Sequence, residues 1–348
     1  MTNYENTKSP HAHASPTEGP EGTADNSTLL LHEFPWLGRQ PFLESKGYML
    51  RPRLRPGWTP SWISNGKDPA LCEDNYPSPM RILVTDATRI ADGKLVCIKK
   101  ISTGNKESNT ALLLRSKQRR EDPRNHSVPI LDVLEDPDDS AVSYMVMPFF
   151  HPMDDPPFES VDEIVDFVDQ VLEGLAFMHE QGVAHRDCSP SNIMMDAAAM
   201  FPCGFHPALN GLLPDASGPV APTMISRSKA GVRYYFVDYD ISSRNAPGHP
   251  EEVTGTEGRD EEVPELAEDV AYNPFKVDVF SMGNLLKHEF HERFSNVDFL
   301  APLLNEMMIE DPMHRPTAEE ALRQWRSIRA DVADTNAPLT RGQEASGE

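Results

Sequence analysis

The stretch that decides the fold reads Val183-Ala-His-Arg-Asp-Cys-Ser-Pro-Ser-Asn-Ile-Met-Met-Asp196. It places a carboxylate, Asp187, five positions before an amide, Asn192, with apolar residues on both sides. At this spacing a carboxylate can accept the proton of a hydroxyl group while the amide oxygen holds a metal ion. The apolar flanks predict short strands that fix the loop in place. The alternative is an ordinary turn that carries polar residues by chance, because a short motif is only a hypothesis.

Length and composition indicate a large globular domain with polar tails. The chain has 348 residues, of which 39% are hydrophobic and 25% are charged, as in ordinary soluble proteins. The formal net charge of -23 argues against binding to nucleic acid or to an anionic membrane, because both need clustered lysine and arginine. We therefore expect a protein substrate, with a basic sequence favoured, and the oligomeric state stays open.

Cysteine usage and the first residues favour an intracellular protein. The four cysteines show neither the spacing of a metal site nor that of a disulfide framework. The start, Met1-Thr-Asn-Tyr-Glu, lacks the apolar region of a signal peptide. No apolar run approaches the ~18 residues of a membrane span. We expect a cytoplasmic or nuclear location, or both.

Changes in composition divide the chain into tails, an extension and a main domain. Residues 1–28 and 331–348 are polar and are predicted to be disordered. Residues 29–78 mix tryptophans with arginines, which is one pattern of a nucleic-acid surface. Large aromatic side chains mostly serve cores and interfaces, so we favour an extension that packs on the main domain, 79–330.

A predicted hairpin carries the candidate lysine of the site. Two runs rich in β-branched residues, 81–90 and 94–100, flank Asp92-Gly93, and this dipeptide is a strong signal for a tight turn between strands. Lys99 lies in the second run. The neighbouring Lys100 is the alternative, and an exposed strand lysine without a role is the ordinary explanation for either.

Further elements follow from hydrophobic patterning. A helix is predicted over 107–120 and strands over 128–134 and 141–147. Ser160-Val-Asp-Glu163 has the pattern of a capping box and opens a long helix with apolar residues at helical spacing. Gly182 is the expected stop of this helix.

Six separated motifs resemble those of protein kinases and occur in the same order. They are Val96-Cys-Ile-Lys99, His185-Arg-Asp187 with Asn192, Asp238-Tyr-Asp240, Val263-Pro-Glu265, Asp278-Val-Phe-Ser-Met-Gly283 and Asp311-Pro-Met-His-Arg-Pro-Thr-Ala318. Each is weak alone, but the series spans most of the main domain. The tryptophan-rich start and Asn125-His126 also look like kinase-like proteins of mushroom-forming fungi.

This resemblance implies an α+β, bilobal, protein-kinase-like fold. The small β-rich N-lobe would cover 79–147 and the larger helical C-lobe 148–330, with an insert at 197–231. The implied activity is an ATP- and Mg²⁺-dependent protein kinase that transfers the γ-phosphate to a protein hydroxyl, with serine or threonine as the expected acceptor.

The resemblance also implies roles for particular side chains. Asp187 would accept the proton of the substrate hydroxyl, and Asn192 and Asp238 would hold Mg²⁺. Lys99 would hold the ATP phosphates, and Glu107 would steady it.

Other positions complete the implied site. Met147 and Phe149 belong to the hinge that would contact adenine, and Asp240 is a candidate further metal ligand. Structural roles fall on His185, Arg186, Glu265, Asp278 and Arg315, with Asp278 beneath the catalytic loop and Arg315 paired with Glu265. Arg186 has two candidate kinds of partner, a phosphate on Ser242, Ser243, Thr254 or Thr256 or an acid such as Glu251.

Three departures from the kinase pattern keep other functions open. No G-x-G-x-x-G precedes Lys99, so the backbone cradle for phosphates is atypical. Ser189 stands where serine/threonine kinases carry a lysine, and Asp240 stands where D-F-G has glycine. A pseudokinase scaffold or allosteric partner is therefore the alternative. A small-molecule kinase is a third possibility, which the Glu265 and Arg315 pattern opposes.

Overall fold

The computed structural model describes residues 26–77, 82–245, 251–332 and 335–342. The predicted disorder of residues 1–28 therefore falls almost entirely outside the described residues, whereas residues 335–342 of the predicted C-terminal tail are described and hydrogen-bond to the helical layer.

The first layer is a five-stranded antiparallel sheet with the order β1-β2-β3-β5-β4. Its strands are β1 (Tyr48–Met49), β2 (Val84–Arg89), β3 (Leu95–Ser102), β4 (Asp132–Glu135) and β5 (Val142–Pro148). The predicted hairpin joins β2 and β3, and Gly93 takes a φ of 71°, which glycine adopts without strain. The strand predicted from residue 128 begins later, because the Val128 N–H donates to the Phe236 carbonyl outside the sheet.

The predicted extension contributes to this sheet. Its helices α1 (Phe34–Leu37) and α2 (Gln40–Ser45) lead into β1, which pairs with β2. Trp36 and Leu43 share an apolar cluster with Val96, Ile98 and Tyr144 of the sheet. The boundary predicted at residue 79 therefore runs through one sheet and one core.

The helix predicted over 107–120 is two helices. They are α4 (Lys106–Arg115) and α5 (Lys117–Arg120), and Ser116 between them has an extended ψ of 148°. The Asn125 side-chain amide donates to the Leu114 and Arg119 carbonyls. A residue from a later loop thus bonds carbonyls on both sides of the break.

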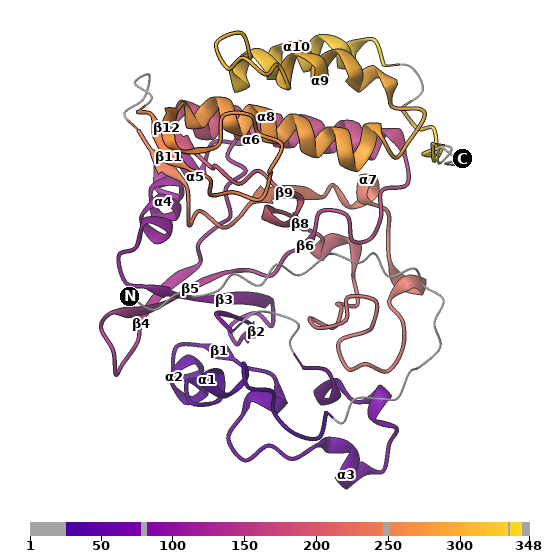
Figure 1. The fold of residues 1–348 in the computed structure, drawn as a ribbon. Coiled ribbons are helices and arrows are strands. Elements are labelled where there is room, and N and C mark those ends of the chain that lie inside the picture. The colour runs from indigo at the N-terminus through magenta and orange to yellow at the C-terminus, as the bar shows by residue number, and fades with distance from the viewer. Residues whose placement is uncertain (1–25, 78–81, 246–250, 333–334, 343–348) are drawn as a thin grey trace, which may run out of the picture.

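The second layer is mainly helical. It contains α6 (Val161–Glu180), α7 (Arg227–Ala230), α8 (Pro274–Leu286) with a π-helical turn at Lys287–His291, α9 (Ala301–Met307) and α10 (Ala318–Ala330). Short strands support these helices: β6 (His151–Pro152), β7 (Val183–Ala184), β8 (Ile193–Asp196), β9 (Arg233–Phe236), β10 (Ser243–Arg244), β11 (Val253–Gly255) and β12 (Ala267–Tyr272). In Figure 1 the sheet occupies the lower half of the molecule and the long helices the upper half, which is the predicted α+β, bilobal arrangement.

Helices α10 and α6 begin differently. At α10, Thr317 and Glu320 exchange the reciprocal bonds of a capping box. At α6 the prediction is wrong, because the Ser160 side chain makes no capping bond. The Val161 and Asp162 N–H groups donate instead to the Ala337 and Thr335 carbonyls. The C-terminal segment therefore replaces the predicted cap.

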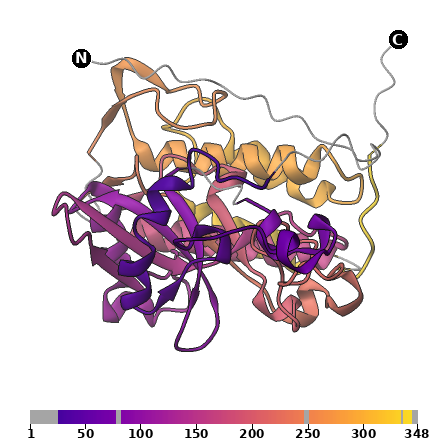
Figure 2. The ribbon, with the colours of Figure 1, turned by 90° about the horizontal axis from the view of Figure 1, so that it is seen from below.

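The predicted insert, 197–231, lies against the N-terminal segment. The His206 ring nitrogen is 3.2 Å from the Glu73 carbonyl oxygen, and its ring lies edge-on to Tyr76. Helix α3 (Ser61–Asn65) belongs to the same N-terminal segment. Figure 2 shows this segment, in indigo, reaching from the sheet to the insert.

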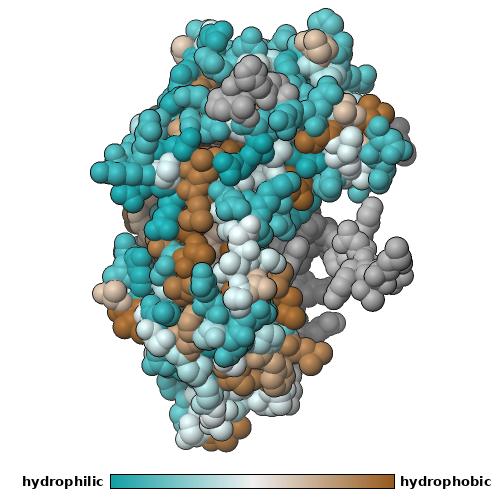
Figure 3. All heavy atoms as spheres, turned by 90° about the vertical axis from the view of Figure 1, so that its left-hand side faces the viewer, coloured by the Kyte–Doolittle hydropathy of each residue, from teal (hydrophilic) through white to brown (hydrophobic). Residues whose placement is uncertain are grey.

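The surface is largely polar. Figure 3 shows one side of the molecule, where hydrophilic residues predominate and apolar atoms form a narrow strip. Among the described residues, none of the helices combines the length and apolar character that a membrane crossing requires.

Candidate active site

The loop between β7 and β8 is held from beneath by a buried carboxylate. Asp278 of α8 is fully buried, and its two oxygens accept the His185 N–H at 2.7 Å and the Arg186 N–H at 2.6 Å. Arg186 has a φ of 68°, which is uncommon for a residue with a side chain. The two hydrogen bonds offset part of the strain and fix the loop ahead of Asp187.

Asp187 and Asn192 are in direct contact. The Asn192 side-chain amide donates to the Asp187 carboxylate at 2.7 Å and to its carbonyl at 3.1 Å. The spacing of five residues therefore closes the loop on itself. The carboxylate side chain is only 11% exposed, so the loop presents it in a fixed position.

Lys99 of β3 links two acids that come from different parts of the chain. Its ammonium group lies 2.7 Å from a Glu107 oxygen and 2.8 Å from an Asp238 oxygen. Lys100 makes no such contact in the described chain, so the strand register selects Lys99, as the motif predicts. Burial lowers the pKa of Lys99, but the charges and hydrogen bonds of Glu107 and Asp238 outweigh burial and raise it.

The two acids respond differently to the same lysine. Burial raises the pKa of Glu107, and the nearby ammonium group only partly counteracts this. Burial also acts to raise the pKa of Asp238, but Lys99 outweighs it and the pKa is lowered. Asp238 is therefore kept ionised at neutral pH, as a metal ligand must be.

The segment after β9, which carries Asp238, contacts the loop that contains His185. A ring nitrogen of His185 lies 2.9 Å from the Val237 carbonyl oxygen, and the buried Tyr239 ring lies 5.2 Å from the His185 ring. Asp238 itself has a φ of 66°. The turn at Asp238 is thus held from the His185 side of the catalytic loop.

A cluster of oxygen donors suits a hard cation. One oxygen from each of Glu107, Asp238 and Asp240 can be chosen so that all lie within 4.8 Å of one another. Mg²⁺ prefers carboxylate and amide oxygens, so this donor set fits the ion that the fold implies. The predicted metal ligands were Asn192, Asp238 and Asp240. In the structure, Glu107 lies with Asp238 and Asp240.

These polar groups line a cavity of about 520 Å³. Its lining also includes apolar residues, among them Val84, Cys97, Met147 and Phe149. Pro148 has no N–H, and the Phe149 N–H donates to the Leu95 carbonyl at 3.3 Å. Met147 and Phe149 therefore lie where the hinge was predicted, but the Phe149 donor is already engaged.

Arg259 is a member of this site that the motifs did not indicate. Its backbone N–H donates to Asp187 at 3.0 Å, and its guanidinium donates to Ser189 at 3.2 Å and to the Asn192 oxygen at 2.9 Å. It also contacts Ser191. Arg259 is the single basic residue of the acidic stretch 251–269, and this was the available signal.

Arg186 is paired with an acid. Its guanidinium donates to Glu257 at 2.9 Å, to the Tyr272 hydroxyl at 3.0 Å and to the Ile241 carbonyl at 3.1 Å. The acid is Glu257 rather than Glu251. The part of the chain around Glu257 is therefore held against the loop of Arg186 by this carboxylate.

Glu265 and Arg315 form the pair that the sequence predicted. The guanidinium donates to both carboxylate oxygens, at 2.6 and 2.9 Å, and the two side chains are 0% and 9% exposed. The pair ties the end of the segment after β11 to the loop before α10.

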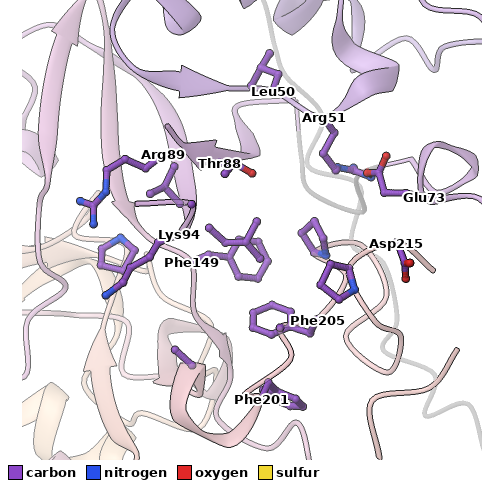
Figure 4. Close-up of a pocket in the computed structure, with 18 of the residues that line it drawn as sticks. Leu50, Arg51, Glu73, Thr88, Arg89, Lys94, Phe149, Phe201, Phe205 and Asp215 are labelled. Atoms are coloured by element: carbon purple, nitrogen blue, oxygen red, sulfur yellow. The ribbon is translucent and has the colours of Figure 1, made fainter. Parts of the chain in front are cut away.

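A larger cavity, of about 840 Å³, lies on the other side of Phe149. Figure 4 shows Phe149 and Phe205 together within it, with Arg51 and Glu73 directed toward each other at one side. Burial raises the pKa of Glu73 to about 6. Of the predicted site residues only Phe149 lines this cavity, whereas Lys99, Asn192 and Asp238 line the smaller one.

Comparison with known proteins supports this arrangement. A family model described as protein kinase domain matches residues 83–210, which include Lys99, Glu107, Asp187 and Asn192. A comparison with curated proteins gave no match. The narrower resemblance to fungal kinase-like proteins stays a prediction. The family match supports membership of the protein kinase superfamily, and the Lys99–Asp238 contact agrees with it by bringing Asp238 to the same site.

Proposed function

We propose that the protein is an ATP- and Mg²⁺-dependent protein kinase that phosphorylates serine or threonine hydroxyls. The observation that carries the proposal is Lys99 bridging Glu107 and Asp238 in a cavity that Asn192 also lines. Three separate regions of the chain supply these charges. Phosphoryl transfer depends mainly on such positioning and on electrostatic stabilisation.

In this mechanism Asp187 orients the acceptor hydroxyl and takes its proton. The hydroxyl oxygen forms a bond to the γ-phosphorus, the bond from that phosphorus to the bridging oxygen breaks, and its electron pair leaves with ADP. Lys99 holds the phosphates of the nucleotide. Asn192 and Asp238, with Asp240 beside them, are the residues that would hold Mg²⁺, which neutralises phosphate charge when bound.

The apolar part of the cavity lining suits the nucleotide base. Ligand sites generally combine apolar walls with a few polar groups that fix orientation. Val84, Cys97 and Met147 supply apolar lining, and Lys99, Glu107, Asp238 and Asp240 supply the charged groups. The net charge of -23 favours an acceptor segment with basic residues.

The competing proposal is a pseudokinase scaffold. Strand β1 ends at Met49, and Arg51 then pairs with Asp86 at 2.8 Å. The chain leaves the sheet where a glycine-rich loop would cover the phosphates. The Glu265–Arg315 pair belongs to the protein-kinase pattern and disfavours a small-molecule kinase.

Calorimetric titration with ATP, with and without Mg²⁺, tests the proposal. We expect Mg²⁺-dependent binding by the wild type and weak binding by Lys99→Met, because that change removes the phosphate-facing charge. Ligand at ~100 times its Kd should add about 2.7 kcal/mol to the free energy of unfolding. An unchanged melting temperature at saturating Mg-ATP would support the scaffold instead.

A further inference from the structure

Arg259 lies beside Ser189, the position at which the kinase pattern has a lysine and this chain does not. Ser189 replaces the lysine that serine/threonine kinases carry two residues after the catalytic aspartate, so the catalytic loop offers no cation there. The Arg259 guanidinium donates to the Ser189 hydroxyl at 3.2 Å and lies 3.7 Å from the Asp187 carboxylate. Arg259 therefore brings a positive charge next to Ser189, where the loop sequence itself supplies none.

The segment that carries Arg259 is anchored on both sides of it, to the loop before it and to helix α8 after it. Before it, Glu257 pairs with Arg186 at 2.9 Å. After it, both Asp260 oxygens accept hydrogen bonds from the buried Asn284 amide, at 3.0 and 3.1 Å. These two anchors leave Arg259 between them, directed at the loop.

Gly258 makes this close approach possible. Its φ is 119°, and a Cβ atom built on it would lie 2.9 Å from the Arg186 carbonyl oxygen. A side chain there would meet backbone, which cannot turn aside as a flexible side chain can. Glycine at position 258 therefore allows the segment to approach the backbone of Arg186 this closely.

We infer that Arg259 supplies the γ-phosphate counter-charge that Ser189 does not. The inference rests on the proposed kinase function. Without nucleotide the guanidinium is held by the Asn192 oxygen, the same atom that the metal role requires. With Mg-ATP bound, the Asn192 oxygen would be available to hold the metal and the guanidinium would face the γ-phosphate oxygens. Arginine suits this position because its planar donors bind phosphate in pairs.

The test uses the full chain and a set of matched variants. Arg259→Ala removes the charge, and the double variant Ser189→Lys/Arg259→Ala returns a charge from the catalytic loop. Arg244→Ala, at an exposed position of β10, is the control. Calorimetry measures the Kd of Mg-ATP and of Mg-ADP, and transfer of labelled phosphate to a basic protein acceptor measures kcat. The Arg259 side chain is 41% exposed but donates to the buried Asn192 oxygen, so its removal should lower the melting temperature only slightly.

The expected pattern is specific to the γ-phosphate. Arg259→Ala should reduce the preference for Mg-ATP over Mg-ADP by about 10-fold, as expected for a lost charge-assisted hydrogen bond. It should lower kcat by about 10²–10³-fold, the usual effect of removing one donor to the transition state. The double variant should recover both quantities, and Arg244→Ala should change neither.

Two results would overturn the inference while leaving the kinase function intact. One is faster transfer by Arg259→Ala, which would make Arg259 a brake that holds the catalytic groups. The other is a combination of two findings. Arg259→Ala would bind Mg-ATP and Mg-ADP with the same affinity ratio as the wild type, and the double variant would not recover kcat. A wild type that neither binds Mg-ATP nor transfers phosphate would remove the proposed function and this inference together.

Discussion

Removing the Arg315 guanidinium should strongly destabilise the fold. This side chain is fully buried and donates to both Glu265 oxygens and to the carbonyls of Lys276, Ile309 and Glu310. Arg315→Ala leaves a carboxylate that is 9% exposed without its cation, and three carbonyls without this donor. Breaking a buried ion pair on one side costs about 3–5 kcal/mol.

An exposed ion pair provides the control. Arg326 contacts Glu173 at 2.9 Å, and the two side chains are 59% and 30% exposed. Exposed pairs contribute about 0–1 kcal/mol, so Arg326→Ala should be nearly neutral. Both changes shorten an arginine to alanine, and they differ in burial and in the number of bonds lost.

Urea unfolding followed by tryptophan fluorescence measures both variants. The buried Trp325 gives a signal from the helical lobe, and the free energy of unfolding follows from the midpoint and slope. We expect Arg315→Ala to unfold at a much lower urea concentration than Arg326→Ala. Equal, small losses below about 1 kcal/mol in both variants would refute it.

Two further predictions concern pH and the metal. Burial lowers the pKa of His151 to about 4, so its neutral form contributes stability that is present above the unfolded pKa of about 6.5 and is lost as pH falls through about 4. His151→Phe, which keeps a ring between Phe201 and Phe205, should flatten this fall by up to about 1.4 kcal/mol per pH unit in urea unfolding, and an unchanged slope would remove His151 as the cause. Asp240→Gly should weaken nucleotide binding only when Mg²⁺ is present, because the exposed carboxylate lies beside Asp238. Tighter Mg-ATP binding by that variant would mark Asp240 as an inhibitory charge.

Local motifs predicted much of the site. Asp187 and Asn192 were predicted as a pair of site residues from one loop motif, and the Asp92-Gly93 turn was predicted from a dipeptide. The Glu265–Arg315 pair is long-range, but each partner lies in a motif of its own. Such features can be predicted because each depends on nearby residues or on a resemblance with fixed spacing.

Other features depend on segments that meet only in the fold. Strand β1 has two residues, too few for a periodic pattern, and its pairing depends on the position of β2. The capping box predicted for α6 is absent because N–H groups of its first turn donate to the carbonyls of Thr335 and Ala337. Arg259 belongs to a polar segment without periodicity, and its role depends on the anchors at Glu257 and Asp260.

The most direct test of the central claim is transfer of labelled γ-phosphate from ATP to a basic protein acceptor by wild type and by Asp187→Asn. Asparagine keeps the size of the side chain but cannot take the hydroxyl proton. We expect the wild type to transfer phosphate only when Mg²⁺ is present. Asp187→Asn should bind nucleotide normally but have a kcat about 10²–10⁴-fold lower. Equal transfer by the two proteins, or none by a wild type that binds Mg-ATP, would contradict it.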